Sequence, residues 1–183
     1  MASCASTLFG YNEDYQIPSD SDFTVNDENW ELKAYVDEFR LPTDNKYIET
    51  TAIVGIFSNS ATTGSECTAQ LRINYKGLVE IVIYEYGQYR ADAYSSERYT
   101  YNVTEVGNRD VVLSKGYATL TDRFSIEGES AVEVINTLCK GGSYIFSLAG
   151  GKYTTSIYVV TFDGTGCAAA LSKLFPIASN VAE

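Results

Sequence analysis

The sequence predicts a mainly β protein: an antiparallel β-sandwich or jelly-roll-like domain with two short helices. Tyrosine is the most abundant aromatic residue, with 15 copies in 183 residues, and it suits the half-buried face of a sheet because its side chain has an apolar body and a polar end. Short apolar or alternating segments recur every 8 to 12 residues or so, with turn residues between them. Helical periodicity appears only in the later part of the chain.

Three regions differ in composition. Residues 1–29 show no sustained period and carry much of the acidity: residues 1–50 contain eleven acidic and three basic side chains. We expect an acidic N-terminal arm at 1–29, one β-sandwich domain at 30–176, and a C-terminal tail at 177–183. A domain of this size can bury a single core.

The strand prediction is clearest where the pattern is regular. Cys67–Asn74 alternates apolar and polar residues, Leu78–Tyr86 is almost continuously apolar, and the two should form a hairpin. Pro42 and Asp44-Asn45 predict a turn-rich connection, and Gly150-Gly151 predicts a two-residue hairpin loop. The expected strands are Trp30–Val36, Thr51–Phe57, Cys67–Asn74, Leu78–Tyr86, Arg98–Val103, Val111–Leu120, Arg123–Ile126, Tyr144–Leu148 and Tyr153–Phe162.

Two short helices are expected near the C-terminus. Ser130–Glu133 has the spacing of a capping box, apolar residues follow at helical intervals as far as Leu138, and Gly141-Gly142 ends the segment. A second helix is expected at Gly166–Leu174, ended by Pro176. Each has one apolar face, which predicts packing against a sheet.

The composition argues against catalysis. There is no histidine, which removes the usual general base and the common nucleophile–histidine arrangements. Glu80 and Glu85 could pair as in a glycosidase, but an odd spacing within one strand points them to opposite faces, and adjacent Asp37 and Glu38 diverge in the same way. Gly164-Thr165-Gly166 predicts a turn and helix N-cap rather than a phosphate loop. We expect no enzyme activity and no cofactor.

Charge limits the partners. Arg72, Arg90 and Arg98 are scattered singly, so direct binding of nucleic acid, which needs clustered cations, is not expected. No apolar stretch reaches the length of a membrane span, so membrane insertion is not expected. The net charge of −11 would suit a basic protein surface or a divalent cation, or simply a solvated face.

Two groups of residues are candidates for partner contacts. Asp20 and Asp22 lie in the arm and, with Asp27 and Glu28, could bind a cation, although their spacing does not fit an EF-hand loop, so no metal site is assigned. The second group is a run of tyrosines that could form an aromatic surface for protein or carbohydrate, or could pack within the sheet. Its members are Tyr84, Tyr86, Tyr89, Tyr94, Tyr99 and Tyr101.

The cysteines leave two questions open. Cys4, Cys67, Cys139 and Cys167 lack the spacing of a metal site. A disulfide between Cys139 and Cys167 is one alternative, and reduced thiols are the more economical one. No signal peptide is evident, yet Met1–Cys4 resembles the end of a lipoprotein signal, which would make Cys4 a lipidation site.

Several stretches together resemble a sequence pattern of small β-rich proteins from gut bacteria and their phages. They are Trp30, Asp37–Ile48, Gly55–Thr63, Tyr84–Gly87 and Asp163–Cys167. The resemblance spans about residues 30–174. Arg40-Leu41 stands where that group has Gly-Asp, and Cys167 where it has an aromatic residue. The resemblance implies the β-rich fold and carries over no catalytic residue.

These observations predict a structural or interaction protein. The first hypothesis is an accessory component of a phage virion, in capsid or tail, that contacts other virion proteins or itself. The second is a cell-surface binding module, lipid-anchored at Cys4, with a protein or carbohydrate ligand. An acidic mimic of nucleic acid ranks last, because the acidic residues concentrate in the arm rather than along one face.

Overall fold

A computed structural model describes residues 29–93, 95–150 and 155–176. All strand pairings in this part of the chain are antiparallel, and the mainly β prediction with two short helices is confirmed. The elements are β1 Trp30–Val36, β2 Pro42–Thr50, β3 Ile53–Ser58, β4 Ser65–Asn74, β5 Val79–Glu85, β6 Tyr89–Arg90, β7 Glu97–Glu105, β8 Asn108–Leu120, β9 Phe124–Ile126, α1 Gly128–Leu138, β10 Ser143–Gly150, β11 Ser156–Asp163 and α2 Cys167–Leu174.

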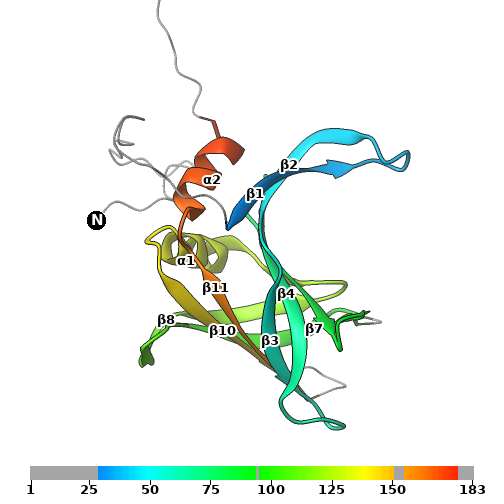
Figure 1. Cartoon of the computed structure of the whole chain (residues 1–183), viewed down its shortest axis with the longest axis vertical. Coiled ribbons are helices and arrows are strands. Elements are labelled where there is room, and N and C mark those ends of the chain that lie inside the picture. The colour runs from blue at the N-terminus through cyan, green and yellow to red at the C-terminus, as the bar shows by residue number, and fades with distance from the viewer. Residues whose placement is uncertain (1–28, 94, 151–154, 177–183) are drawn as a thin grey trace, which may run out of the picture.

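Eight of these strands close into a barrel rather than a sandwich or jelly roll (Figure 1). Their order is β4-β3-β11-β10-β7-β8-β9-β5, and β5 pairs back onto β4. The expected hairpin of β4 and β5 therefore forms the closing pair of the barrel. The prediction of two packed sheets was wrong because alternation only tells which residues face inward, and that pattern is the same in a sandwich and in a barrel.

The barrel interior is filled with large side chains, as an eight-stranded barrel allows. Tyr99 packs edge-to-face on Phe124 at a centroid distance of 5.0 Å, and Phe146 packs in the same way on Phe162 at 5.3 Å. The largest fully buried side chains are Tyr99, Tyr101, Phe57, Phe124, Phe146, Phe162, Ile48, Leu71, Ile73, Ile81, Ile83 and Ile126. The core therefore lies mainly inside the barrel, and Ile48 of β2 and the apolar faces of both helices extend it.

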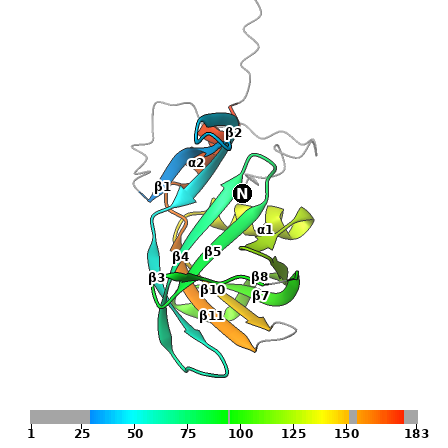
Figure 2. The same ribbon diagram turned by 90° about the vertical axis from the view of Figure 1, so that its right-hand side faces the viewer.

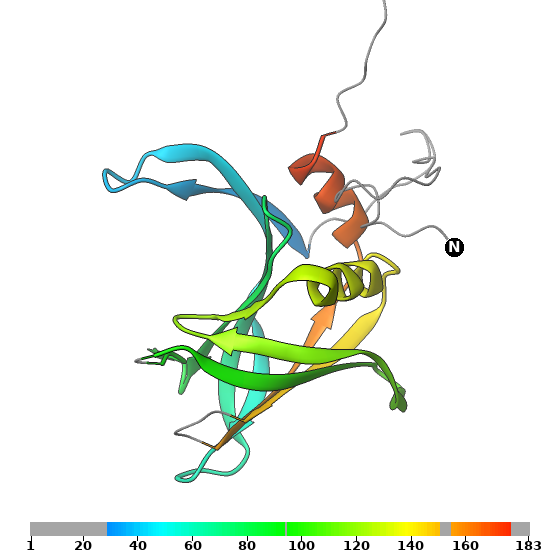
Figure 3. The same ribbon diagram turned by 180° about the vertical axis from the view of Figure 1, so that it is seen from behind.

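The hairpin of β1 and β2 extends away from the barrel (Figures 1 and 3). Residues 42–50 were predicted to be turn-rich, but they form strand β2, because Pro42 stands at the first position of the strand, where proline is tolerated. β2 joins β4 only from Tyr47 to Glu49. At this base the buried Glu49 carboxylate binds Lys33 of β1 and Arg72 of β4, which ties the hairpin to the barrel.

Helix α1 packs against β8 and β5, and its apolar face joins the core (Figure 3). It begins at Gly128, two residues before the predicted start, and no side chain caps its first turn. The predicted capping box was wrong because Ser130 lies inside the helix, and the Glu133 carboxylate accepts a hydrogen bond from Ser114 Oγ at 3.3 Å. Tyr101 OH lies 3.2 Å from the same Ser114 oxygen.

Helix α2 packs against β1 and β2 (Figure 2). The predicted turn and N-cap at its start are confirmed: Gly166 is the N-cap residue, with a φ of 83°. The Asp163 carboxylate accepts hydrogen bonds from Thr165 N at 2.8 Å and Asn29 Nδ2 at 2.9 Å, and Trp30 Nε1 donates to the Asp163 carbonyl at 3.1 Å. The turn thus joins the end of β11 to the start of β1.

Two further expectations concern connections and cysteines. Gly150 pairs with Ser156, a register that excludes the predicted two-residue loop at Gly150-Gly151, and Gly151 itself lies outside the described residues. The sulfur atoms of Cys139 and Cys167 lie 4.0 Å apart, about twice the length of an S–S bond, so these two residues are thiols in contact. Within the described residues, no helix has the length and apolar character needed to cross a membrane.

Candidate functional site

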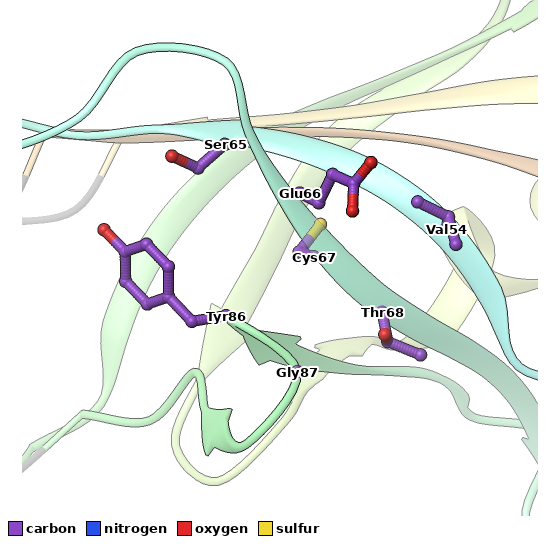
Figure 4. A pocket seen from close by; sticks show the side chains of 7 residues that line it. All are labelled: Val54, Ser65, Glu66, Cys67, Thr68, Tyr86 and Gly87. Carbon is purple, nitrogen blue, oxygen red and sulfur yellow. The ribbon is translucent and has the colours of Figure 1, made fainter.

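A surface pocket lies where β3, β4 and the turn after β5 meet. Its volume is about 510 Å³. Tyr86 and Ser65 lie at one end and Val54 and Thr68 at the other, with Glu66 and Cys67 between them (Figure 4). The full lining is Val54, Ser65, Glu66, Cys67, Thr68, Tyr86 and Gly87.

Strand register brings these residues together. Val54 of β3 pairs with Thr68 of β4, and Cys67 of β4 pairs with Glu85 at the end of β5. β3 lies close against β11 at Gly55, where an added Cβ would be 2.3 Å from Val160 Cγ1. Three consecutive strands, β3, β4 and β5, therefore form one continuous wall behind the pocket.

The turn that follows β5 positions Tyr86. Its φ of 51° is positive, as is the φ of 73° at Gly87, and positive φ at both central residues is the geometry of a type I′ hairpin turn. Gln88 N donates to the Glu85 carbonyl at 3.1 Å, which closes the turn. The Tyr86 ring packs edge-to-face on Phe57 with centroids 5.0 Å apart, so a side chain that is 53% exposed is also held in place.

Behind Tyr86, aromatic contacts continue into the barrel. Phe57 stacks on Tyr158 at 6.0 Å, and Tyr158 contacts Phe124 at 5.3 Å. Tyr158 OH donates a 2.6 Å hydrogen bond to the Glu85 carboxylate. Burial, followed by that hydrogen bond, raises the pKa of Tyr158 above its usual range, so the phenol stays a neutral donor at physiological pH.

The Cys67 thiol at the floor of the pocket is not activated. Burial, and then the charge of Glu85, raises the pKa of Cys67 to about 11. A thiol attacks as a thiolate, and reactive cysteines have a lowered pKa. Cys67 therefore does not supply an activated nucleophile to the pocket.

The predicted tyrosine surface is divided by the barrel wall. Tyr99 and Tyr101 point inward and are fully buried, so they pack in the core and cannot form an exposed surface. Tyr84 is partly buried, and Tyr86 and Tyr89 are exposed. The other proposed contacts, Tyr94, Asp20 and Asp22, lie outside the described residues, as does Cys4.

The predicted divergence of Glu80 and Glu85 agrees with the structure. Glu80 lies on the outer face of β5, where its carboxylate is 3.4 Å from Arg123 Nη1 and accepts a hydrogen bond from Tyr35 OH at 3.3 Å. Glu85 instead contacts Tyr158. The two carboxylates form separate networks on opposite faces of one strand.

Glu97 is a buried acidic residue that the sequence pattern did not single out. This residue is only 7% exposed, and its Oε2 atom is buried without a hydrogen-bond partner. The alternation of β7 could have predicted its burial, because Glu97 lies two residues before Tyr99 in the row of inward-facing residues that continues with Tyr101 and Val103. The predicted strand began one residue later, at Arg98. A buried carboxylate oxygen without a hydrogen-bond partner lowers the stability of the folded state, so Glu97 destabilises this part of the core.

The tip of the β1–β2 hairpin is a second candidate for contacts. The Asp37 carboxylate accepts hydrogen bonds from the backbone N–H groups of Phe39 and Leu41, both at 2.9 Å, and Arg40 has a φ of 63°. This ordered turn exposes Val36, Phe39 and Leu41, with Phe39 75% exposed. The start of the stretch Asp37–Ile48, which resembles the pattern described above, therefore forms the turn of a projecting hairpin.

No family model, curated protein or solved structure matches this chain. Among the described residues, no three His, Cys, Asp or Glu side chains lie close enough together to hold a metal ion. The two candidate sites differ in chemistry. The hairpin tip exposes three large apolar side chains, and the pocket is lined by polar, apolar and aromatic residues.

Proposed function

We propose that this chain is a non-enzymatic interaction protein and that it serves as an accessory component of a phage virion, in capsid or tail. Its partners are other virion proteins or further copies of the same chain. The exposed apolar tip of the β1–β2 hairpin is the observation that carries the proposal.

The tip has the properties of a protein-binding element. Large apolar side chains that gather on an exposed surface favour burial against a partner, and aromatic residues are frequent among the residues that dominate binding energy. Asp37 fixes the turn through two backbone hydrogen bonds, so little ordering entropy remains to be lost when the tip docks. Glu49, held by Lys33 and Arg72, anchors the base of the hairpin.

A non-enzymatic role agrees with the chemistry of the chain. There is no histidine, and the Cys67 thiol has a pKa of about 11, raised by burial. Tyr158 is engaged as a hydrogen-bond donor to Glu85. None of these groups is prepared to act as a nucleophile or general base near neutral pH.

A second role is favoured by the pocket beside Tyr86: a surface-anchored binding module, lipidated at Cys4, whose ligand occupies that pocket. The exposed and well-held ring of Tyr86 supports this alternative. The two roles use different surfaces and are separable by mutation.

The virion role is tested on particles purified from the native source. We expect intact-mass measurements to find this chain, without a lipid adduct, at a fixed copy number per particle. A chain that is absent from particles, or that carries a lipid on Cys4, would overturn the virion role.

The role of the hairpin is tested with the double variant Phe39→Ser/Leu41→Ser. Losing two central apolar anchors should weaken incorporation into particles by about 30-fold or more, while the melting temperature of the isolated protein stays near that of the wild type. The matched control is Val111→Ser/Val112→Ser in β8. It also removes two exposed apolar side chains, from residues that are 48% and 46% exposed. Equal incorporation of both double variants would exclude the tip as the contact.

A further inference from the structure

We propose that the pocket between β3, β4 and the β5–β6 turn binds a neutral carbohydrate, with one sugar ring stacked on Tyr86. This inference rests on the second proposed role, that of a binding module, and specifies its ligand class. It does not depend on the hairpin or on a virion.

Tyr86 has the form of a stacking platform. A pyranose ring has an apolar face made of C–H groups and a rim of hydroxyls, so it pairs well with an aromatic ring that has polar groups around it. The Tyr86 ring is 53% exposed and rests edge-on against Phe57. Because this contact already restricts the side chain, stacking a ligand on it costs little further entropy.

The polar groups of the pocket match sugar hydroxyls, which both donate and accept hydrogen bonds. The hydroxyls of Ser65 and Thr68 and the carboxylate of Glu66 all come from β4, and all three residues line the pocket (Figure 4). Ser65 Oγ lies 2.5 Å from Thr62 Oγ1, a contact that fixes its position. A hydroxyl has one donor and two acceptor sites, so Ser65 retains capacity for a ligand.

The charge and the size of the pocket limit the class of ligand that it can bind. Glu66 lines the pocket, Glu85 lies just behind it, and no ion pair to either carboxylate occurs in the described part of the chain. These negative charges would repel uronic acids, sialic acids and phosphorylated sugars. The pocket is an open hollow of about 510 Å³, so a ligand would lie along the surface rather than be enclosed. Val54 supplies an apolar surface at the end opposite Tyr86.

The turn that carries Tyr86 leaves space beside this residue. Neighbouring Gly87 has a φ of 73°, and nothing lies within 4 Å of the position of an added Cβ. A ligand can therefore approach the turn beside the Tyr86 ring without meeting a side chain there.

The test is affinity electrophoresis of the full chain in native gels that contain one polysaccharide each: yeast mannan, glycogen, xylan, galactomannan, or the acidic polygalacturonate. We expect at least one neutral polymer to retard the protein, and polygalacturonate not to. Tyr86→Asn removes the ring, yet asparagine tolerates the left-handed backbone conformation. It should weaken retardation by about tenfold or more, whereas Tyr86→Phe should keep it.

The matched control is Tyr89→Asn, which removes a tyrosine that is 62% exposed and does not line the pocket. Thermal unfolding of each variant confirms that the barrel is intact. The inference is overturned if no neutral polymer retards the wild type, if only the acidic polymer does, or if folded Tyr86→Asn binds as well as the wild type. Incorporation of Tyr86→Asn into particles should be normal, which separates this result from the test of the virion role.

Discussion

Replacing Gly164 by alanine should destabilise the fold through one backbone contact. Gly164 lies in the turn between β11 and α2, and its N–H donates to the Gly142 carbonyl at 2.7 Å. A Cβ at this position would lie 2.4 Å from the carbonyl oxygen of Leu138 and 3.1 Å from Tyr144 Cε2. The Leu138 oxygen belongs to the backbone of α1, so it cannot turn away as a flexible side chain would.

The magnitude follows from this geometry. Real Cβ contacts are essentially never shorter than 3.0 Å, so the turn and the end of α1 would have to separate by at least 0.6 Å. Overpacking of this kind costs about 1–3 kcal/mol, and a backbone obstacle argues for the upper value. A loss of about 3 kcal/mol lowers the melting temperature by roughly 6–12 °C in a chain of this size.

The assay is calorimetric or circular-dichroism melting of Gly164→Ala beside Gly107→Ala. Gly107 has a φ of 92° with open space around it, so alanine there costs only the backbone conformation, about 1 kcal/mol, or roughly 2–4 °C. If Gly164→Ala melts within that smaller range, the turn is not held against α1 as closely as described, and the reasoning is refuted.

Two further predictions concern buried groups of the barrel. Glu97→Met removes the carboxylate with the unpartnered oxygen and should stabilise the protein by about 1–3 kcal/mol in urea unfolding; a lower midpoint would show that the carboxylate is satisfied. Alkaline pH should destabilise the fold, because the pKa of Cys67 is raised to about 11 and that of Tyr158 is also raised by burial. Above about pH 9 the unfolded chain loses these protons first, so melting temperatures should be level below about pH 8.5 and then fall through pH 11; a flat profile would contradict the burial of both groups.

The sequence by itself determined where most strands and both helices lie. Strict alternation places Cys67, Ala69, Leu71 and Ile73 on one face, and all four are buried. The apolar face of α2, from Cys167 to Leu174, is buried in the same way. These local patterns are readable because each strand or helix must bury one side whatever the fold. Strand β2 was not predicted, because its first residues are exposed and show no apolar face.

Only the tertiary structure decided how the strands close into a barrel and which strands become neighbours. The sequence predicts the β4–β5 hairpin, but whether β5 also pairs with β9, and β3 with β11, depends on accumulated twist and register, which no single segment encodes. Closure assigned Tyr99 and Tyr101 to the core and left Tyr86 at the surface. The pocket itself joins Val54 and Tyr86 across the consecutive strands β3, β4 and β5. The aromatic contact behind it, between Phe57 and Tyr158, depends on the pairing of β3 with β11, two strands that are distant in the sequence.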